Sequence, residues 1–239
     1  MLVGAVALGA NAKGSCDVAG TVYSVDTTFH AYIGPGTTQT SMLLQSGNKH
    51  LRVFYTTVDL TNPYVKIRAV SGTDMMAGGE TVSQMCERKT EPGQRYYVGV
   101  NGDFWLTSGT TGRGQSVVGT PIGTSMAKGV VYKGVNGVEI QYSIDANQVP
   151  TIGYVNFGGT IVGANGTVNI GGVNTDTPNN TVGIYNPTYF KGTNQSNVTE
   201  VQVRYVDGDD SFAFGKPCKL EVVNTPSACL LYTSPSPRD

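Results

Sequence analysis

Short runs of β-branched and aromatic residues, each closed by a turn-forming pair, recur along most of the chain. The clearest of these segments extend from Lys49 to Leu60, from Val130 to Tyr142, from Thr151 to Phe157 and from Glu200 to Val206. Apolar and polar residues alternate within them, and Asn-Gly, Asn-Pro or Gly-rich pairs permit tight reversals of the backbone. We expect a turn at Gly34-Pro35-Gly36, and the tip of a hairpin at Asn136-Gly137 within the run from Val130. The composition agrees with this pattern, since 32 of the 239 residues are glycine. We therefore expect mainly antiparallel β-sheet.

One segment has the period of a helix instead. Between Glu80 and Arg88, apolar residues recur at helical spacing, Thr81 is a candidate cap, and Pro92-Gly93 provides a stop. Tyr64 to Val70 alternates like a strand and is expected to pair with the run from Lys49, and a further strand is expected from Arg95 to Val100. A helix between strands predicts an α+β fold with few short helices.

The two ends have their own patterns. Leu2 to Ala10 is apolar but too short to span a bilayer, and Ala10-Asn11-Ala12 fits a signal-peptidase site. We interpret residues 1–12 as part of a signal peptide, with an apolar first strand as the alternative. The segment 229–239 resembles translated sequencing-adapter sequence, with a genuine Pro/Ser-rich tail as the alternative. We expect one domain at 13–228, exported to the periplasm or outside the cell, without a transmembrane segment.

Several classes of partner are not expected. The net charge is −1 and there is no basic patch for nucleic acid. The chain has four cysteines and two histidines, without a Cys-x-x-Cys or His pair, so neither a metal nor another cofactor is predicted. If Cys229 is not native, the cysteine count is odd, and the sequence does not choose a disulfide pair. It does not predict the oligomeric state either.

The segment from Tyr96 to Trp105 combines a turn, an acid and bulky aromatics. Asn101-Gly102 favours a tight reversal, and Asp103, Phe104 and Trp105 follow it directly. Two interpretations are open: a hairpin whose aromatics belong to the core, or a turn that presents a carboxylate between rigid rings to a substrate.

Blocks in and after this segment resemble the phosphodiester glycosidase family, which includes the lysosomal uncovering enzyme that removes N-acetylglucosamine from mannose-6-phosphate. They are Val98 to Phe104, Gly119 to Gly123 and Lys128 to Tyr132, with supporting similarity at 65–70, 183–192 and 199–203. The resemblance implies a secreted hydrolase that cleaves the glycosidic C1–O bond of a sugar-1-phosphodiester in a phosphorylated glycan or exopolysaccharide. Later Arg-Thr and Asp-Gly-Gly-Gly-Ser-Ser blocks of the family do not occur in this sequence. We therefore expect an incomplete, inactive N-terminal portion of a longer domain.

This chemistry requires a carboxylate at the anomeric carbon and donors for the phosphate, because the transition state resembles an oxocarbenium ion. Asp103 is the candidate carboxylate, and Asn101 either donates to a sugar hydroxyl or fixes the turn. Arg113 is the candidate phosphate contact, with Arg68 as the alternative. Further candidate substrate contacts are Thr73, Asp74, Ser83 and Trp105.

A second function explains the same composition without catalysis. Export, aromatic residues and a Thr/Asn/Gly-rich β structure are also typical of a carbohydrate-binding or surface-adhesion module. The two hypotheses differ in whether Asp103 takes part in bond cleavage.

Overall fold

The computed structural model describes residues 14–110, 116–175, 181–189, 199–206 and 214–224. The chain divides into two units. Unit 1 contains the residues up to Ile67 together with Arg95–Val98, and unit 2 contains Arg68–Gln94 and the residues from Gly99 onward. Each unit is described by itself.

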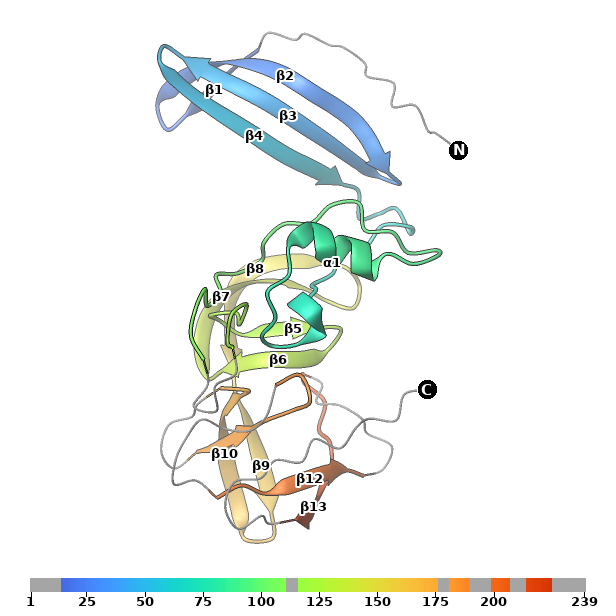
Figure 1. Cartoon of the computed structure of the whole chain (residues 1–239), viewed down its shortest axis with the longest axis vertical. Helices are drawn as coiled ribbons and strands as arrows, with labels where there is room; N and C mark the ends of the chain where they lie inside the picture. The colour runs from blue at the N-terminus through green and yellow to red at the C-terminus, as the bar shows by residue number, and fades with distance from the viewer. Residues whose placement is uncertain (1–13, 111–115, 176–180, 190–198, 207–213, 225–239) are drawn as a thin grey trace. The chain divides into compact units, whose positions relative to one another are not determined.

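Unit 1 is a four-stranded antiparallel sheet with the strand order β1-β2-β3-β4 (Figure 1). Its strands are β1 (Gly14–Val18), β2 (Thr21–Gly34), β3 (Thr37–Ser46) and β4 (Lys49–Val58). The strand predicted from Lys49 and the turn at Gly34-Pro35-Gly36 are confirmed. The first three strands were not predicted, because Thr, Ser and Gln at alternate positions conceal the apolar period that usually marks a strand.

The predicted pairing of β4 is wrong. β4 pairs with β3 in unbroken register, from Thr37 opposite Val58 to Ser46 opposite Lys49. Residues 64–70 form no strand. After β4 the chain enters a series of turns in which Asp59 and Asn62 accept backbone hydrogen bonds, from Asn62 N and Val65 N respectively. Fewer residues separate β4 from β3 than from residues 64–70, so closing the loop between β3 and β4 costs less conformational entropy.

Unit 2 contains the remaining described strands and the only α-helix of the described residues. The strands are β5 (Ser125–Ala127), β6 (Val130–Val135), β7 (Gly137–Ile144), β8 (Pro150–Phe157), β9 (Gly159–Gly163), β10 (Gly166–Val173), β11 (Val182–Ile184), β12 (Gln202–Tyr205) and β13 (Leu220–Asn224). One sheet has the order β11-β10-β6-β5, and β9 also pairs with β10. β7 pairs with β8, and β12 with β13. The prediction of a β-rich chain is confirmed.

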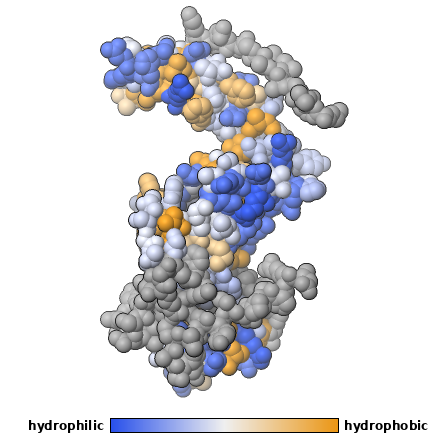
Figure 2. Space-filling model, in the orientation of Figure 1, coloured by the Kyte–Doolittle hydropathy of each residue, from blue (hydrophilic) through white to orange (hydrophobic). Residues whose placement is uncertain are grey.

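The core of unit 2 is small. Val131, Phe157 and Val173 are buried together, and Ile170 and Ile184 pack against them. Figure 2 shows that hydrophobic side chains also reach the surface of both units, between hydrophilic ones. None of the described helices is long and apolar enough to cross a membrane.

The expected helix is α1 (Val82–Lys89). Thr81 caps it: its side chain accepts from Gln84 N at 3.3 Å, and the Gln84 side chain accepts from Thr81 N at 2.9 Å. Arg88 and Lys89 lie in the last turn, where positive charge is favourable to the helix dipole. The prediction of this helix and its cap is confirmed.

The expected hairpin at Asn136-Gly137 does not form. β6 pairs with β5 and β10, whereas β7 pairs with β8, so the chain passes from one sheet to another between Val135 and Gly137. Gly137 has a φ of 127°, which permits this change of direction. The Phe157 ring of β8 occupies the space that a side chain at Gly134 would need, so the close packing of Phe157 on β6 depends on this glycine.

Candidate functional site

The turn before Asp103 differs from the one predicted. Residues 95–100 form no strand, and neither Asn101 nor Gly102 has a positive φ. A two-residue reversal of the expected kind would need positive φ at both positions. The Asn-Gly pattern was misleading, because residues 104–106, which follow it, pair with a later part of the chain instead.

The partner is the segment that precedes β5. Leu106 N donates to Thr120 O at 2.9 Å, and Gly119 N donates to Leu106 O at 2.9 Å. Ile122 N donates to Phe104 O at 2.9 Å, and Trp105 lies opposite Pro121. The Asn-Gly-Asp-Phe and Gly-Thr-Pro-Ile-Gly blocks, separated in the sequence, are therefore antiparallel neighbours.

This pairing places Asp103 beside a second carboxylate. Asp103 Oδ1 accepts from Phe104 N at 2.7 Å, and Oδ2 accepts from Gly123 N at 3.1 Å. Glu139, on β7, accepts from the next amide, Thr124 N, at 2.9 Å. We call Asp103 and Glu139 the carboxylate pair.

Gly123 separates the two acids. A Cβ at this position would lie 3.6 Å from Asp103 Oδ2 and 3.3 Å from Glu139 Oε2. Because both oxygens lie within 3.6 Å of the same point, they are no more than about 7 Å apart, compared with roughly 5 to 9.5 Å between paired carboxylates in glycosidases. A side chain at Gly123 would therefore contact both acids and crowd Glu139.

A nearby lysine partly offsets the negative charges of the carboxylate pair. The hydrogen bond from Thr124 N lowers the pKa of Glu139 against the opposing effect of burial, so Glu139 is ionised at neutral pH. Half-buried Lys133, on β6, donates to Pro121 O at 2.7 Å and to Ile122 O at 2.8 Å. Burial lowers the pKa of Lys133, while the charges of Asp103 and Glu139 act in the opposite direction. Lys133 thus interacts with the carboxylate pair through its charge, while its ammonium group is hydrogen-bonded to the two carbonyls.

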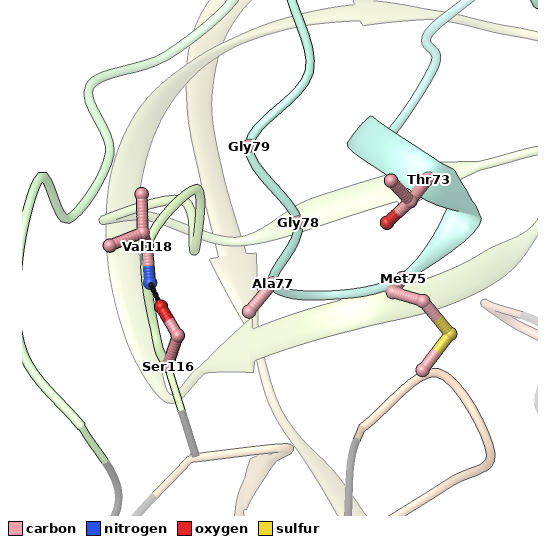
Figure 3. Close-up of a pocket in the computed structure, with 7 residues that line it drawn as sticks. All are labelled: Thr73, Met75, Ala77, Gly78, Gly79, Ser116 and Val118. Atoms are coloured by element: carbon pink, nitrogen blue, oxygen red, sulfur yellow. Dashed lines mark hydrogen bonds between the residues drawn. The ribbon is translucent and has the colours of Figure 1, made fainter.

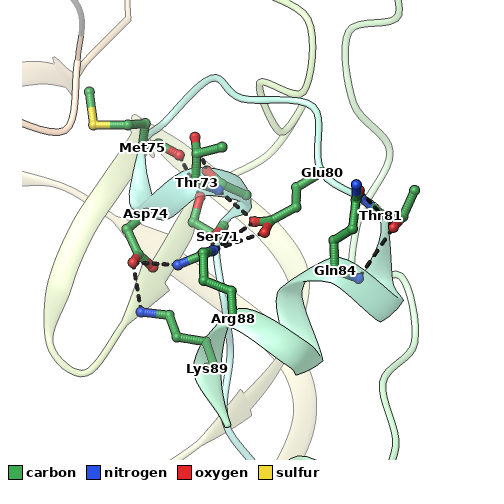
Figure 4. Close-up of polar contacts among 10 residues, drawn as sticks. Ser71, Thr73, Asp74, Met75, Glu80, Thr81, Gln84, Arg88 and Lys89 are labelled. Atoms are coloured by element: carbon green, nitrogen blue, oxygen red, sulfur yellow. Dashed lines mark hydrogen bonds and ion pairs between the residues drawn. The ribbon is translucent and has the colours of Figure 1, made fainter. Parts of the chain in front are cut away.

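A second polar group joins the 71–80 loop to α1 (Figure 4). Arg88 binds Asp74 Oδ2 at 2.6 Å and Glu80 Oε2 at 2.7 Å, and Lys89 Nζ binds the same Asp74 oxygen at 2.7 Å. Glu80 Oε2 also accepts from Thr73 N at 2.8 Å. We call Asp74, Glu80, Arg88 and Lys89 the ion-pair cluster.

The cluster has a structural role. Hydrogen bonds from Arg88 and Thr73 lower the pKa of Glu80 to about 2, and the bond to Glu80 raises the pKa of Arg88. Thr73 and Asp74 have φ values of 53° and 57°, a region that non-glycine residues seldom adopt. The ion pairs hold the loop in this conformation, so the predicted substrate contact Asp74 is already occupied by Arg88 and Lys89.

Thr73 borders a hollow of about 510 Å³ (Figure 3). Its lining is Thr73, Met75, Ala77, Gly78, Gly79, Ser116 and Val118. The two walls approach so closely that a Cβ on Gly119 would lie 2.7 Å from Gly78 C. The lining is largely apolar and contains no charged residue among the described part of the chain, so it suits a nonpolar surface better than a phosphate.

The structure places the other predicted site residues as follows. Asn101 is exposed, and Trp105 is 45% exposed beside Asp103. Arg68 Nη1 donates to Gln94 Oε1 at 2.6 Å, and no described contact joins it to Asp103. Ser83 Oγ lies 3.1 Å from Thr81 Oγ1, at the helix cap. Arg113 lies outside the described residues.

Sequence reasoning missed Glu139 and Lys133. Glu139 is the only acid in the run from Val130 to Tyr142, and Lys133 is its only cation. A lone charge at an alternating position of a strand is a signal for an inward polar contact, but the run was interpreted as one hairpin. Because β6 and β7 were expected to pair with each other, neither Glu139 nor Lys133 could be placed next to Asp103.

A buried amide network was also missed. Asn174 is 2% exposed, and its Nδ2 donates to Tyr132 O at 2.7 Å, to Asn186 Oδ1 at 2.9 Å and to Thr188 Oγ1 at 3.0 Å. Asn186 Nδ2 donates to Val131 O at 2.7 Å. Thr188 O in turn accepts from Met76 N at 2.8 Å. The network connects the 71–80 loop to β6 and β10.

Comparisons of the chain with protein-family models, with curated proteins and with solved structures found no match.

Proposed function

We propose that the protein is an exported glycosidase that hydrolyses the C1–O bond of a sugar-1-phosphodiester in a phosphorylated glycan or exopolysaccharide. The observation that carries the proposal is the convergence of Asp103 and Glu139 on Gly123. Two of the sequence blocks that resemble phosphodiester glycosidases meet at this point.

The ionisation of Glu139 suits this leaving group. An ordinary glycoside needs a protonated acid for its leaving oxygen, whereas a phosphodiester leaves without full protonation. Glu139, with its lowered pKa, cannot supply a proton at neutral pH. Carboxylates at this position can stabilise a developing oxocarbenium ion, and one can attack the anomeric carbon or activate water.

Exposure separates the roles of the two acids. Asp103 is exposed, so we assign to it the attack on the anomeric carbon or the activation of water. Glu139 is half-buried and held by Thr124 and Gln141, so we assign to it electrostatic stabilisation. Asn101 and Trp105 are assigned to sugar contacts, and Arg113 is the candidate for the phosphate.

The bond that breaks can be identified by isotope. The chain, and the product of the whole gene that encodes it, are incubated with sugar-1-phosphodiesters in ¹⁸O-labelled water, and both products are analysed by mass spectrometry. Cleavage of the C1–O bond places the label in the free sugar. A label in the phosphate would identify a phosphodiesterase, and the absence of cleavage by both proteins would refute the proposal.

Two substitutions test the carboxylate pair. Glu139→Gln removes charge and keeps an oxygen for Thr124 N. Asp103→Asn also removes charge, but its single oxygen can accept from only one of the two amides of Phe104 and Gly123. Each is expected to lower the rate by about 10²-fold or more. Matched controls are Asp26→Asn, on β2 of unit 1, and Glu87→Gln, on α1, both at exposed positions. Unchanged activity of Asp103→Asn would remove Asp103 from the mechanism.

Exposed aromatics favour a second candidate, a carbohydrate-binding module. Phe104 is 83% exposed and Trp105 is 45% exposed, next to one another and to Asp103. Aromatic faces of this kind can stack on sugar rings. Trp105 is the only tryptophan, so its fluorescence reports directly on binding. Saccharide binding that survives Asp103→Asn but is lost in Trp105→Ala, without turnover in the parent chain, would favour this function.

A further inference from the structure

The β7–β8 hairpin has an inverted distribution of polar and apolar residues. Its two strands pair from Gly137 opposite Phe157 to Ile144 opposite Pro150, and alternate residues point to opposite faces. One face contains Glu139 and Gln141, which bind the Thr124 backbone. The polar face is therefore the one that contacts the rest of unit 2.

The opposite face is apolar and uncovered. Its five large side chains are Val138, Ile140, Tyr142, Ile152 and Tyr154, which are 64%, 67%, 56%, 78% and 78% exposed. Cross-strand pairing sets Ile140 opposite Tyr154 and Tyr142 opposite Ile152, so the five form one continuous surface. We call it the hairpin face. An apolar surface of this size on a protein normally marks an interaction site.

We propose that the hairpin face binds the same face of a second copy of this chain, giving a two-fold symmetric dimer. From the exposed fractions, the five residues offer at most about 700 Å² per copy, so two copies can bury up to about 1,400 Å² in total, compared with the roughly 1,200–2,000 Å² of a stable interface. The face can therefore supply the main part of a dimer interface.

The charge distribution agrees with self-association. In a two-fold interface each residue meets the same surface of the other copy, so a charged face would repel itself. Among the described residues of the hairpin face none is charged. Glu139 lies on the other face, and Asp145 lies in the connecting turn, where it accepts from Asn147 N and Val149 N. The dimer does not depend on the proposed catalysis.

Light scattering at increasing protein concentration tests the proposal. We expect the mass to rise from 25.2 kDa towards twice that value. Ile140→Lys, in the middle of β7, is expected to weaken the dimer by more than 10-fold, since it places two like charges in the interface. The control is Val162→Lys on β9, which adds the same charge at a valine that is 78% exposed.

Two variants with opposite charges at position 140 distinguish a loss of dimerisation from misfolding. Ile140→Lys and Ile140→Glu are each expected to be monomeric, and an equal mixture is expected to recover dimers that contain one copy of each. A monomeric parent chain at all concentrations, equal loss in Val162→Lys, or an unaffected Ile140→Lys dimer would overturn the proposal. A monomer that retains a polysaccharide through Tyr142 and Tyr154 would identify the face as a glycan platform and would also overturn it.

Discussion

Asp103 and Glu139 accept hydrogen bonds from consecutive backbone amides, those of Gly123 and Thr124, at 3.1 and 2.9 Å. The two acids are distant in the sequence and lie on different elements. Their meeting point is a glycine in a turn that neither acid belongs to.

Gly123→Ala is expected to disturb the carboxylate pair. The added Cβ would lie 3.3 Å from Glu139 Oε2, closer than most side-chain contacts, so Glu139 must shift relative to Asp103. We expect activity on a sugar-1-phosphodiester to fall by about 10-fold or more, with a stability cost of about 1 kcal/mol. The control is Gly153→Ala, where an added Cβ meets nothing within 4 Å. Equal effects of the two substitutions would contradict the assignment.

Glu80→Gln is expected to loosen the 71–80 loop. The substitution removes the charge that binds Arg88 and weakens the acceptor for Thr73 N. We expect a loss of about 1 to 3 kcal/mol in the free energy of unfolding, measured by urea denaturation. Glu87→Gln, an exposed change in the same helix, serves as the control and is expected to have little effect. Equal stability of the two variants would show that the ion-pair cluster is not needed.

The same carboxylate predicts a pH dependence of stability. Folding lowers the pKa of Glu80 from 4.5 to about 2, so the unfolded chain binds a proton more readily than the folded one. Its stabilising contribution is complete above pH 4.5 and is lost as the pH falls through about 2. In thermal melts the parent chain should therefore lose more stability than Glu80→Gln between these two values. Parallel curves would exclude this contribution.

Asn174→Ala is expected to destabilise unit 2. The change removes the Nδ2 donor to Tyr132 O and the Oδ1 acceptor of Asn186 N, and the residue adopts a φ of 54° that alanine disfavours. We expect a cost of about 2 to 4 kcal/mol in the free energy of unfolding. Asn169→Ala, at an exposed position of β10, is the control and should cost little. A cost below that of the control would show that the network is not needed.

Local sequence patterns predicted several elements correctly. Alternation identified β4 and β8, and the change of period together with the Thr81 cap identified α1. Strands rich in Thr, Ser and Gln were missed in β2 and β3, because their apolar period is weak. Partner choice failed twice, for β4 and for β6, since alternation describes a strand but not the strand beside it.

In the candidate site, too, the local sequence identified one residue, and only the tertiary structure identified its neighbours. The sequence alone singled out Asp103, because an acid next to a turn and two aromatics is unusual, and it predicted a β-rich chain from residue types that favour a pleated backbone. Glu139 and Lys133 became visible only when the tertiary structure assigned β6 and β7 to different sheets and paired residues 104–106 with 119–122. The physical reason is that local conformation depends on neighbours in the sequence, whereas a carboxylate pair depends on packing between segments that the chain brings together only on folding.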